Sequence, residues 1–546
     1  MATVREVTYD LLRSFGMTTI FGNPGSTEET FLHAFPDDFT YVLGLQEAAV
    51  VGMADGYAQA TGHAAFVNLH TAPGVGHAMG ALVTAWHAKS PLVITAGQQV
   101  RAMMTLEPWL INRDAVDLPK PYVKWSYEPP RAADVPAAIE RAYHIAMQPP
   151  TGPVFVSIPM DDWDAPATPH HPRTVSYRVA PDPAALAQVV ARLRSAARPL
   201  LVAGPGIDRG GAWETAIALA ERIQAPVWMA PAAERGGFPQ DHPQFQGMLP
   251  LAMAPMAERL AGHDVVVVCG APVFRYYPYL PGPIVPEGTT LFHLTDDPDE
   301  AARAPAGTAI VGDIGLALER LLADLPAAER EMPARRPPPA PPPSPVPEEP
   351  MAPAVAMQAL AKALPNNAVI VEEAASNRAV FFDQIRINQP GGYFATASGG
   401  LGFAVPAAVG VQMARPDRQV VCVVGDGAAI FALPALWTAA QHRLPIVYIV
   451  LRNGHYGILK SFAVFHGLNE GIPGLELPGL DLVALAHGFG CAARRIDQAS
   501  EIDGALHAAF TEARRDGTPV LLEVVVDANV PSLVPGHQAE LTAGPA

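Results

Sequence analysis

Two turns in the C-terminal third of the chain carry side chains that could bind a metal ion and a phosphate group. A valine-rich run ends in Gly425-Asp426-Gly427, and the next apolar run ends at Asn453, just before His455. A carboxylate, an amide oxygen and a main-chain carbonyl are the hard oxygen donors that Mg²⁺ prefers. Glycines let the backbone approach a phosphate closely, and a helix N-terminus offers free N–H groups. The pattern predicts a magnesium and diphosphate site, although strand-end turns without ligands also use Gly and Asp freely.

Short apolar runs that alternate with alanine-rich, helix-like stretches would position these turns. Runs that are apolar on both faces are typical of buried parallel strands with helices packed on either side. The sequence therefore predicts an α/β fold of doubly wound parallel sheets, with a helix over 428–441 joining two strands whose carboxyl ends meet at one edge. The apolar runs lie at 91–97, 152–159, 199–206, 264–272, 368–373, 419–427, 445–453 and 519–527.

Two polar, proline-bearing breaks divide the chain. The first spans 166–185, and the second, REMPARRPPPAPPPSPVPEEP, predicts an extended, semi-rigid linker. We expect three α/β domains at 1–165, 182–325 and 351–530, with a proline-rich linker at 326–350.

The composition favours a well-packed, acidic protein. Hydrophobic residues make up 49% and charged residues 16% of the chain, which is far from the signature of disorder. The formal net charge of −17 disfavours nucleic acid as a partner. The N-terminus lacks the apolar centre of a signal peptide, and no apolar run approaches the roughly 20 residues of a membrane span. We therefore expect a cytoplasmic protein without membrane partners, and its three dispersed cysteines fit neither a disulfide framework nor a zinc cluster.

The pattern around Gly-Asp-Gly and Asn453 resembles the thiamine-diphosphate motif. Over almost the whole chain, the sequence is similar to the benzoylformate decarboxylases, a branch of the thiamine-diphosphate-dependent 2-oxo-acid decarboxylase and acetolactate synthase family. This resemblance implies a pyrimidine-binding, a central and a diphosphate-binding domain, with thiamine diphosphate and Mg²⁺ (or Ca²⁺) as cofactors. It also implies a homotetramer in which each active site is shared between the first domain of one subunit and the third domain of another. The matching stretches are FGNPGSTEETFL, GLQEAAVVGMADGYAQATG, VNLHTAPG, PLVITAGQQ, VKWSYEP, GAPVFRYYPY and GGLGFAVPAAVG.

Glu47 matches the carboxylic acid that activates the cofactor in this family. Burial among its alanine and valine neighbours would raise the pKa of Glu47, whereas a helix N-terminus would favour its charged form, and the residues alone leave both open. A solvent-exposed glutamate in a first helical turn is the ordinary alternative. Leu401 resembles the bulky apolar residue that keeps the cofactor bent, and the carbonyls of Gly399 and Gly400 would reach its aminopyrimidine. The residues implied to bind the cofactor are Ser376, Gly399, Leu401, Gly425, Asp426, Gly427, Ala428, Asn453, Tyr456 and Gly457, and those implied to bind the metal are Asp426, Asn453 and His455.

Ser26 and His70 match residues near the reacting carbon. A serine hydroxyl can bind the substrate carboxylate, and a histidine can move protons near neutral pH. Ser26 as a helix cap and His70 as a structural strand-end histidine are the alternatives. Tyr277 stands where the benzoylformate decarboxylases carry a second catalytic histidine, and with a pKa near 10 it would be a poorer proton shuttle that favours carbon–carbon ligation. The implied walls of the substrate pocket are Trp109 (a smaller aliphatic residue in the family pattern), Leu110, Ile458 and Phe462.

We predict non-oxidative decarboxylation of an aromatic or other apolar 2-oxo acid to an aldehyde and CO₂. A carboligase of the acetolactate-synthase or aldehyde-ligating type is the alternative within the family. A nicotinamide or flavin oxidoreductase would use Gly204 and Gly206, but Arg209 stands where the dinucleotide fingerprint needs glycine or alanine. A cofactor-binding protein with regulatory duties is the non-enzymatic alternative, which the retention of the activating glutamate and both metal-binding side chains disfavours.

Overall fold

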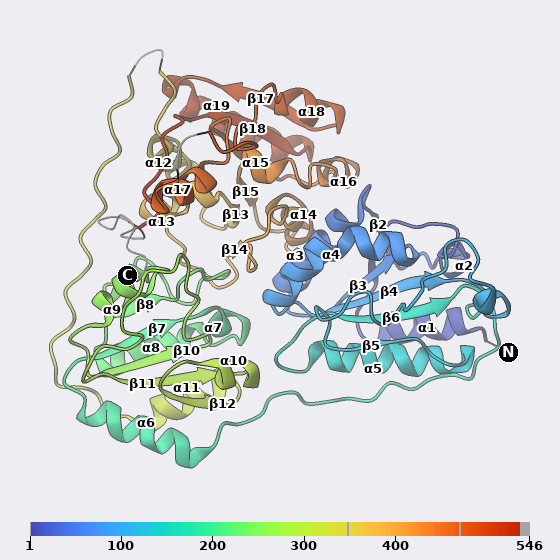
Figure 1. Ribbon diagram of the computed structural model, residues 1–546, viewed down its shortest axis with the longest axis horizontal. Helices are drawn as coiled ribbons and strands as arrows, with labels where there is room; N and C mark the ends of the chain where they lie inside the picture. Colours follow the sequence, from blue (N-terminus) through green and yellow to red (C-terminus); the bar gives the residue numbers. More distant parts are fainter. Residues whose placement is uncertain (1, 347–348, 469–470, 535–546) are drawn as a thin grey trace, which may run out of the picture.

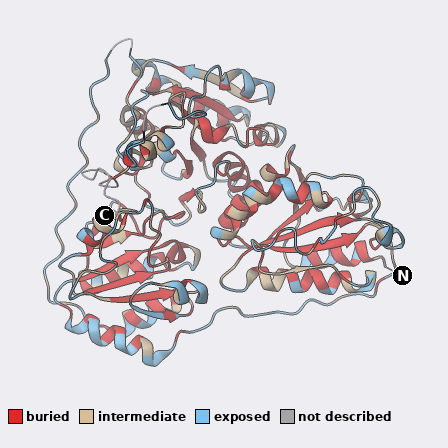
Figure 2. Cartoon of the chain, viewed as in Figure 1, coloured by how far each residue is buried: buried red, intermediate tan, exposed pale blue. Residues whose placement is uncertain are grey.

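The computed structural model describes residues 2–346, 349–468 and 471–534 and contains three six-stranded sheets (Figure 1). Every neighbouring pair of strands within these sheets is parallel, and helices pack on both faces. The central strands are buried along their whole length, as Figure 2 shows, which explains why they are apolar at consecutive positions. The doubly wound α/β fold predicted from the sequence is confirmed.

The first sheet has the strand order β2-β1-β3-β4-β6-β5. Its first helix begins at a capping box between Thr3 and Glu6, which satisfies free N–H groups at the helix start. The strands are β1 Thr19–Gly22, β2 Thr40–Leu43, β3 Ala65–Leu69, β4 Leu92–Gln98, β5 Ser126–Tyr127 and β6 Val154–Pro159. The helices are α1 Val4–Ser14, α2 Glu29–Leu32, α3 Glu47–Thr61, α4 Thr71–His87 and α5 Val135–Met147, with 3-10 helices η1 Arg101–Leu106 and η2 Ala132–Asp134.

The second sheet has the order β12-β11-β10-β7-β8-β9, the order of a doubly wound dinucleotide-binding sheet. Gly204 and Gly206 nevertheless pack directly against the backbone of Gly270, so their missing side chains allow two loops to touch. The strands are β7 Pro199–Ala203, β8 Val227–Met229, β9 Phe245–Met248, β10 Val265–Cys269, β11 Thr290–Thr295 and β12 Thr308–Val311. The helices are α6 Pro183–Ser195, α7 Pro205–Arg209, α8 Trp213–Ile223, α9 Met253–Leu260, α10 Pro298–Arg303 and α11 Ile314–Asp324.

The third sheet, β14-β13-β15-β16-β18-β17, repeats the strand order of the first. The strands are β13 Val369–Glu373, β14 Tyr393–Ala395, β15 Val420–Gly425, β16 Val447–Arg452, β17 Ala492–Ile496 and β18 Val520–Val525. The helices are α12 Pro353–Ala363, α13 Arg378–Gln384, α14 Ala404–Ala414, α15 Asp426–Ala429, α16 Ala435–Gln441, α17 Gly457–Phe465, α18 Leu482–Gly488 and α19 Ile502–Asp516, with 3-10 helices η3 Ala375–Asn377 and η4 Ala499–Glu501.

The prediction of a single helix over 428–441 is wrong. The structure forms two short helices there, α15 and α16, and Pro434 stands immediately before the second. Proline lacks an N–H donor and its ring clashes with the preceding turn, so one continuous helix cannot run through it. The Gly-Asp-Gly turn keeps its expected place, because α15 begins at Asp426.

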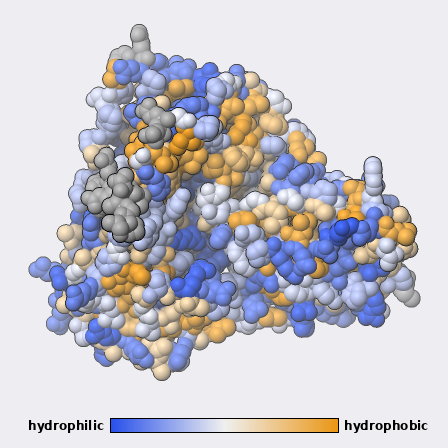
Figure 3. All heavy atoms as spheres, in the orientation of Figure 1, coloured by the Kyte–Doolittle hydropathy of each residue, from blue (hydrophilic) through white to orange (hydrophobic). Residues whose placement is uncertain are grey.

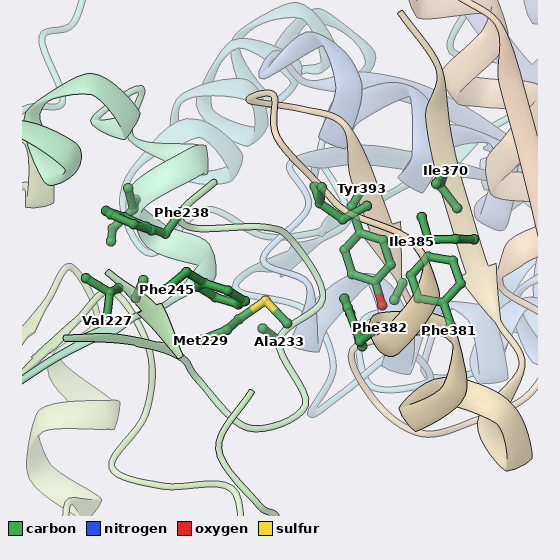
Figure 4. Packing of buried hydrophobic residues seen from close by; sticks show 14 of the residues in the cluster. Val227, Met229, Ala233, Phe238, Phe245, Ile370, Phe381, Phe382, Ile385 and Tyr393 are labelled. Carbon is green, nitrogen blue, oxygen red and sulfur yellow. The ribbon is translucent and has the colours of Figure 1, made fainter. Parts of the chain in front are cut away.

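Close helix packing joins the first and third domains. Helices α3 and α14 cross where Gly52 and Gly56 of α3 face Pro406 and Ala407 of α14, and a Cβ atom on Gly410 would collide with the backbone of α3. A continuous apolar cluster also connects the central and third domains (Figure 4). Both proline-bearing breaks run along the outside of the molecule in Figure 1, and the described residues of 330–350 form neither helix nor strand.

All three cysteines are buried thiols. Within the described residues, the structure has no helix of the length and apolarity that a membrane crossing requires.

Candidate active site

The Gly-Asp-Gly turn and Asn453 lie side by side at the carboxyl edge of the third sheet. Gly425 of β15 pairs with Leu451 of β16, so the residues that follow these strands emerge next to each other. Asp426 is buried, and its two carboxylate oxygens each accept a backbone N–H at 2.8 Å, from Gly427 and from Gly454. The second contact joins the two turns directly. Burial raises the pKa of the Asp426 carboxyl, while the two N–H donors favour its charged form.

Two glycines let neighbouring side chains approach the backbone closely at this edge of the sheet. A Cβ atom on Gly427 would lie 2.6 Å from a ring carbon of Tyr456. A Cβ atom on Gly457 would lie 3.0 Å from Oγ of Ser376 and 3.1 Å from Nδ2 of Asn453. The structure therefore brings these five residues together at the ends of neighbouring strands. With Asp426, they are called the third-domain half of the site below.

The His455 ring contacts a lysine and is not arranged as a metal ligand. Its Nδ1 lies 2.7 Å from Nζ of Lys460, which pairs with Glu476 at 2.5 Å. Burial and the nearby ammonium group lower the pKa of His455. Within the described residues, no group of three or more His, Cys, Asp or Glu side chains is arranged to hold a metal. A metal here would need the oxygen set of Asp426, Asn453 and the His455 carbonyl, which suits a hard cation.

Glu47 is the first residue of α3 and is only 8% exposed. Its Oε1 accepts a hydrogen bond from Nδ2 of Asn23 at 3.1 Å, and its Oε2 lies 3.2 Å from Nδ1 of His77. The alternative of a solvent-exposed glutamate is wrong, because α4 covers the side chain. A Cβ atom on Gly74 would lie 3.5 Å from Glu47 Oε1 and 3.4 Å from Cβ of His70, so Glu47 and His70 flank the same turn of α4.

His70, at the junction of β3 and α4, is held by a buried carboxylate. Its Nδ1 lies 2.8 Å from Oε2 of Glu28, which is 1% exposed. Glu28 also accepts hydrogen bonds from Gly25 N at 2.9 Å, Gly97 N at 2.8 Å and Thr27 Oγ1 at 2.8 Å. Four donors therefore fix this carboxylate, which in turn fixes the imidazole. Asn23, Glu28, Glu47, His70 and His77 are called the first-domain half of the site below.

Ser26 is exposed beside this half, and its role as a helix cap is wrong. The N-cap position of α2 belongs to Glu28, and no side chain caps that helix. The Ser26 hydroxyl is therefore free to face solvent or a ligand.

The loop before α14 carries Leu401 at the junction of the first and third domains. Gly399 and Gly402 have φ angles of +77° and +101°, which favour glycine, and Leu401 between them is exposed. The Ser398 hydroxyl lies 2.8 Å from Oγ1 of Thr84 on α4. The loop is thus anchored to the first domain of its own chain.

The residues expected to line the substrate pocket fall into two groups. Tyr277 lies against Phe462 of α17, with ring centroids 4.6 Å apart, and Ile458 lies one turn earlier on the same helix. Trp109 and Leu110 follow η1 in the first domain, and Trp109 is 91% exposed. A single chain therefore does not place Trp109 in a pocket.

Three family models match the chain in order. The N-terminal TPP binding domain of thiamine pyrophosphate enzymes matches residues 2–113, the central domain matches 186–321, and the C-terminal TPP binding domain matches 374–524. A benzoylformate decarboxylase of Pseudomonas aeruginosa is 48% identical over 96% of this chain and 99% of its own length. The chain belongs to the thiamine pyrophosphate enzyme family.

Solved structures of thiamine pyrophosphate (thiamine diphosphate) enzymes share the fold closely. Benzoylformate decarboxylase from Polynucleobacter necessarius is 43% identical with a TM-score of 0.93, covering 97% of this chain and 100% of that one. The 4-hydroxybenzoylformate decarboxylase of Rhodococcus jostii is 44% identical with a TM-score of 0.92, at the same coverage.

Three members of the first-domain half were not predicted from the sequence of this thiamine pyrophosphate enzyme. Asn23 and His77 contact Glu47, and Glu28 contacts His70. The one available signal was the charge of Glu28 in the stretch GNPGSTEET, but the adjacent Glu29 has the same type and is exposed. Only the folded structure distinguishes the buried Glu28 from the exposed Glu29.

Proposed function

We propose that this chain catalyses the thiamine-diphosphate-dependent, non-oxidative decarboxylation of an aromatic or other apolar 2-oxo acid, with benzoylformate as the model substrate, to an aldehyde and CO₂. The observation that carries the proposal is the pairing of His70 with the buried Glu28 carboxylate beside the exposed Ser26, in a chain 48% identical to a benzoylformate decarboxylase. A free hydroxyl can hold the substrate carboxylate, and an oriented imidazole next to it can move protons to and from the substrate's keto oxygen and carbon.

The third-domain half fits a metal-bound diphosphate. Asp426, Asn453 and the His455 carbonyl would hold Mg²⁺, and the backbone around Gly427, Ala428, Tyr456 and Gly457, with Ser376, would hold the diphosphate. Gly427 and Gly457 support this role, because a side chain at either would collide with Tyr456 or with Ser376 and Asn453 and displace residues of the proposed site. When bound, thiamine diphosphate supplies a nucleophilic carbon and an electron sink.

His70 and Glu47 would handle protons. With Nδ1–H donated to the Glu28 carboxylate, His70 keeps a lone pair at Nε2, where it can take up or deliver a proton. Glu47 would hold a proton at a carboxyl oxygen, in a position set by Asn23 and His77. The Ser26 hydroxyl would donate a hydrogen bond to the substrate carboxylate.

We also propose that the active enzyme is a homotetramer with shared sites. Apolar side chains gather on the face shown in Figure 3, over the third domain and on part of the first. Large apolar residues exposed in a single chain include Leu106 and Trp109 of the first domain and Phe431, Val464 and Leu468 of the third. Association would cover such residues and bring Trp109 and Leu110 of one subunit to the pocket wall of another. The domain boundaries at 1–165, 182–325 and 351–530 and the cytoplasmic location stay predictions.

Carboligation is a second candidate activity because of Tyr277. Its hydroxyl is on an exposed ring beside Phe462, where the family resemblance implies a histidine. A phenol transfers protons poorly at neutral pH, so a second aldehyde would have more time to react.

Product analysis separates the two activities. The holoprotein would be incubated with benzoylformate alone and with added acetaldehyde, and the products would be resolved by chromatography. Benzaldehyde and CO₂ in equal amounts in both mixtures support decarboxylation as the main activity. A 2-hydroxyketone as the major product with acetaldehyde would support ligation, and no CO₂ release in either mixture would overturn both.

A further inference from the structure

Strand β13 ends in two consecutive buried carboxylates, Glu372 and Glu373. Successive side chains of a strand point to opposite sides, so the two carboxylates serve different neighbours. Glu373 pairs in register with Val424 of β15, directly before the Gly-Asp-Gly turn. Burying two adjacent carboxylates is costly unless each is well hydrogen-bonded, so their partners indicate what they do.

Glu373 holds the loop that carries Leu401. Its Oε1 accepts the N–H of Gly402 at 2.8 Å, and its Oε2 accepts those of Phe403 at 3.0 Å and Ala404 at 2.8 Å. These N–H groups lie at the start of α14, where a helix has no internal acceptors for them. The Glu373 carboxylate, which lies at the end of β13, thus caps α14 and fixes the position of Leu401.

Glu372 holds the turn that carries Ser376. Its Oε1 accepts the N–H of Ala374 at 2.6 Å, and its Oε2 accepts Nε of Arg378 and the hydroxyl of Tyr393, both at 2.9 Å. Ala374 and Arg378 flank the 3-10 helix η3, in which Ser376 lies at the centre. Both ends of this turn are therefore tied to one carboxylate.

We propose that Glu372 and Glu373 are positioning residues that set the Ser376 turn and the Leu401 loop at a fixed separation across the end of β13. The proposal rests on the proposed function, in which Ser376 helps to hold the diphosphate, and on the family resemblance, which implies that Leu401 keeps the cofactor bent. Neither carboxylate has an atom free to meet a ligand, because every oxygen is engaged by protein donors. The pair acts on cofactor affinity through the two loops.

The test uses Glu373→Gln in the full-length protein, with Glu319→Gln, an exposed glutamate on α11, as the matched control. The amide –NH₂ of glutamine must face at least one backbone N–H that the carboxylate accepted. We expect amide hydrogen exchange of residues 402–404 to accelerate at least about tenfold without cofactor, while residues 374–378 keep the wild-type rate. Calorimetric titration should show thiamine diphosphate binding weakened about tenfold or more, and Glu319→Gln should match wild type in both measurements.

Tyr393→Phe probes the other carboxylate, because it removes one donor to Glu372 and little volume. It should accelerate exchange at 374–378 and leave 402–404 unchanged. If Glu373→Gln does not fold, Glu373→Asp replaces it with the same expectations. Wild-type exchange at 402–404, or faster exchange with unchanged cofactor affinity, overturns the positioning role. A wild-type protein that binds no thiamine diphosphate overturns the proposed function, and the positioning role with it.

Discussion

The Glu28→Gln variant should show whether activity needs the orientation of His70 that Glu28 sets, or only the presence of the imidazole. The Glu28 carboxylate receives four donors, two on each oxygen: Gly97 N and Thr27 Oγ1 on Oε1, and Gly25 N and His70 Nδ1 on Oε2. A glutamine side chain has only one carbonyl oxygen, so its –NH₂ must replace one of these acceptors. Either orientation breaks contacts at a buried position.

The two orientations have different consequences for the imidazole. If the amide oxygen stays toward His70, the –NH₂ faces the N–H of Gly97, which is repulsive. If the amide flips, its –NH₂ donates to Nδ1 of His70 and forces the proton onto Nε2, where the proposed chemistry needs a lone pair. Loss of a correctly oriented general acid–base typically costs 10²–10⁴-fold, which is about 3–5 kcal/mol in the transition state. We expect kcat/KM for benzoylformate to fall within that range and KM to change little.

The assay couples aldehyde formation to an NADH-dependent alcohol dehydrogenase and records kcat/KM between pH 5.5 and 8.5. Glu29→Gln is the matched control, since Glu29 is adjacent, has the same charge and is exposed. The control should retain wild-type values at every pH, whereas Glu28→Gln should lose activity and change the shape of the profile. Equal kcat/KM values and profiles for the two variants would refute the role given to Glu28.

Three further predictions address the metal, the pocket and stability. Asp426→Asn should weaken Mg²⁺-dependent thiamine diphosphate binding by at least about 100-fold, more than an outer-shell change usually does; calorimetric affinity within threefold of wild type would contradict the metal site. Trp109→Leu should raise the kcat/KM ratio of 4-methylbenzoylformate to benzoylformate about tenfold by enlarging the pocket, and an unchanged ratio would place Trp109 outside it. Burial raises the pKa of Asp55 to about 6, so the folded state binds this proton more tightly than the unfolded state and loses stability as pH rises through roughly 4 to 6. Asp55→Asn should remove that loss, worth roughly 3 kcal/mol above pH 6, and raise Tm at pH 8 but not at pH 4; an equal shift at both pH values would contradict the argument.

The strands and the third-domain half could be predicted because their signals are local. Valine-rich runs apolar on both faces become buried parallel strands, and Asp426 and Asn453 follow two of them directly. The prediction of one helix over 428–441 overlooks Pro434, where the structure divides it into α15 and α16. This error affects only the connection between two strands, because the strands themselves keep their places.

The support around the catalytic candidates could not be predicted, because it depends on contacts distant in sequence. Glu28 is buried by Gly97 and His70, which lie on other strand ends, whereas Glu29 next to it is exposed. The place of Trp109 in the pocket stays a prediction for a different reason. Its side chain is 91% exposed in the single chain, so this role rests on the proposed second subunit.

The two halves of the site are proposed to perform thiamine-diphosphate-dependent decarboxylation together. The most direct measurement is the release of labelled CO₂ from [1-¹³C]benzoylformate by protein first freed of metal and cofactor. CO₂ should appear only when both Mg²⁺ and thiamine diphosphate are restored, in equal amount to benzaldehyde, and should be lost in Glu47→Gln. CO₂ release that needs neither cofactor, or no CO₂ release when both are present, would contradict the proposed function.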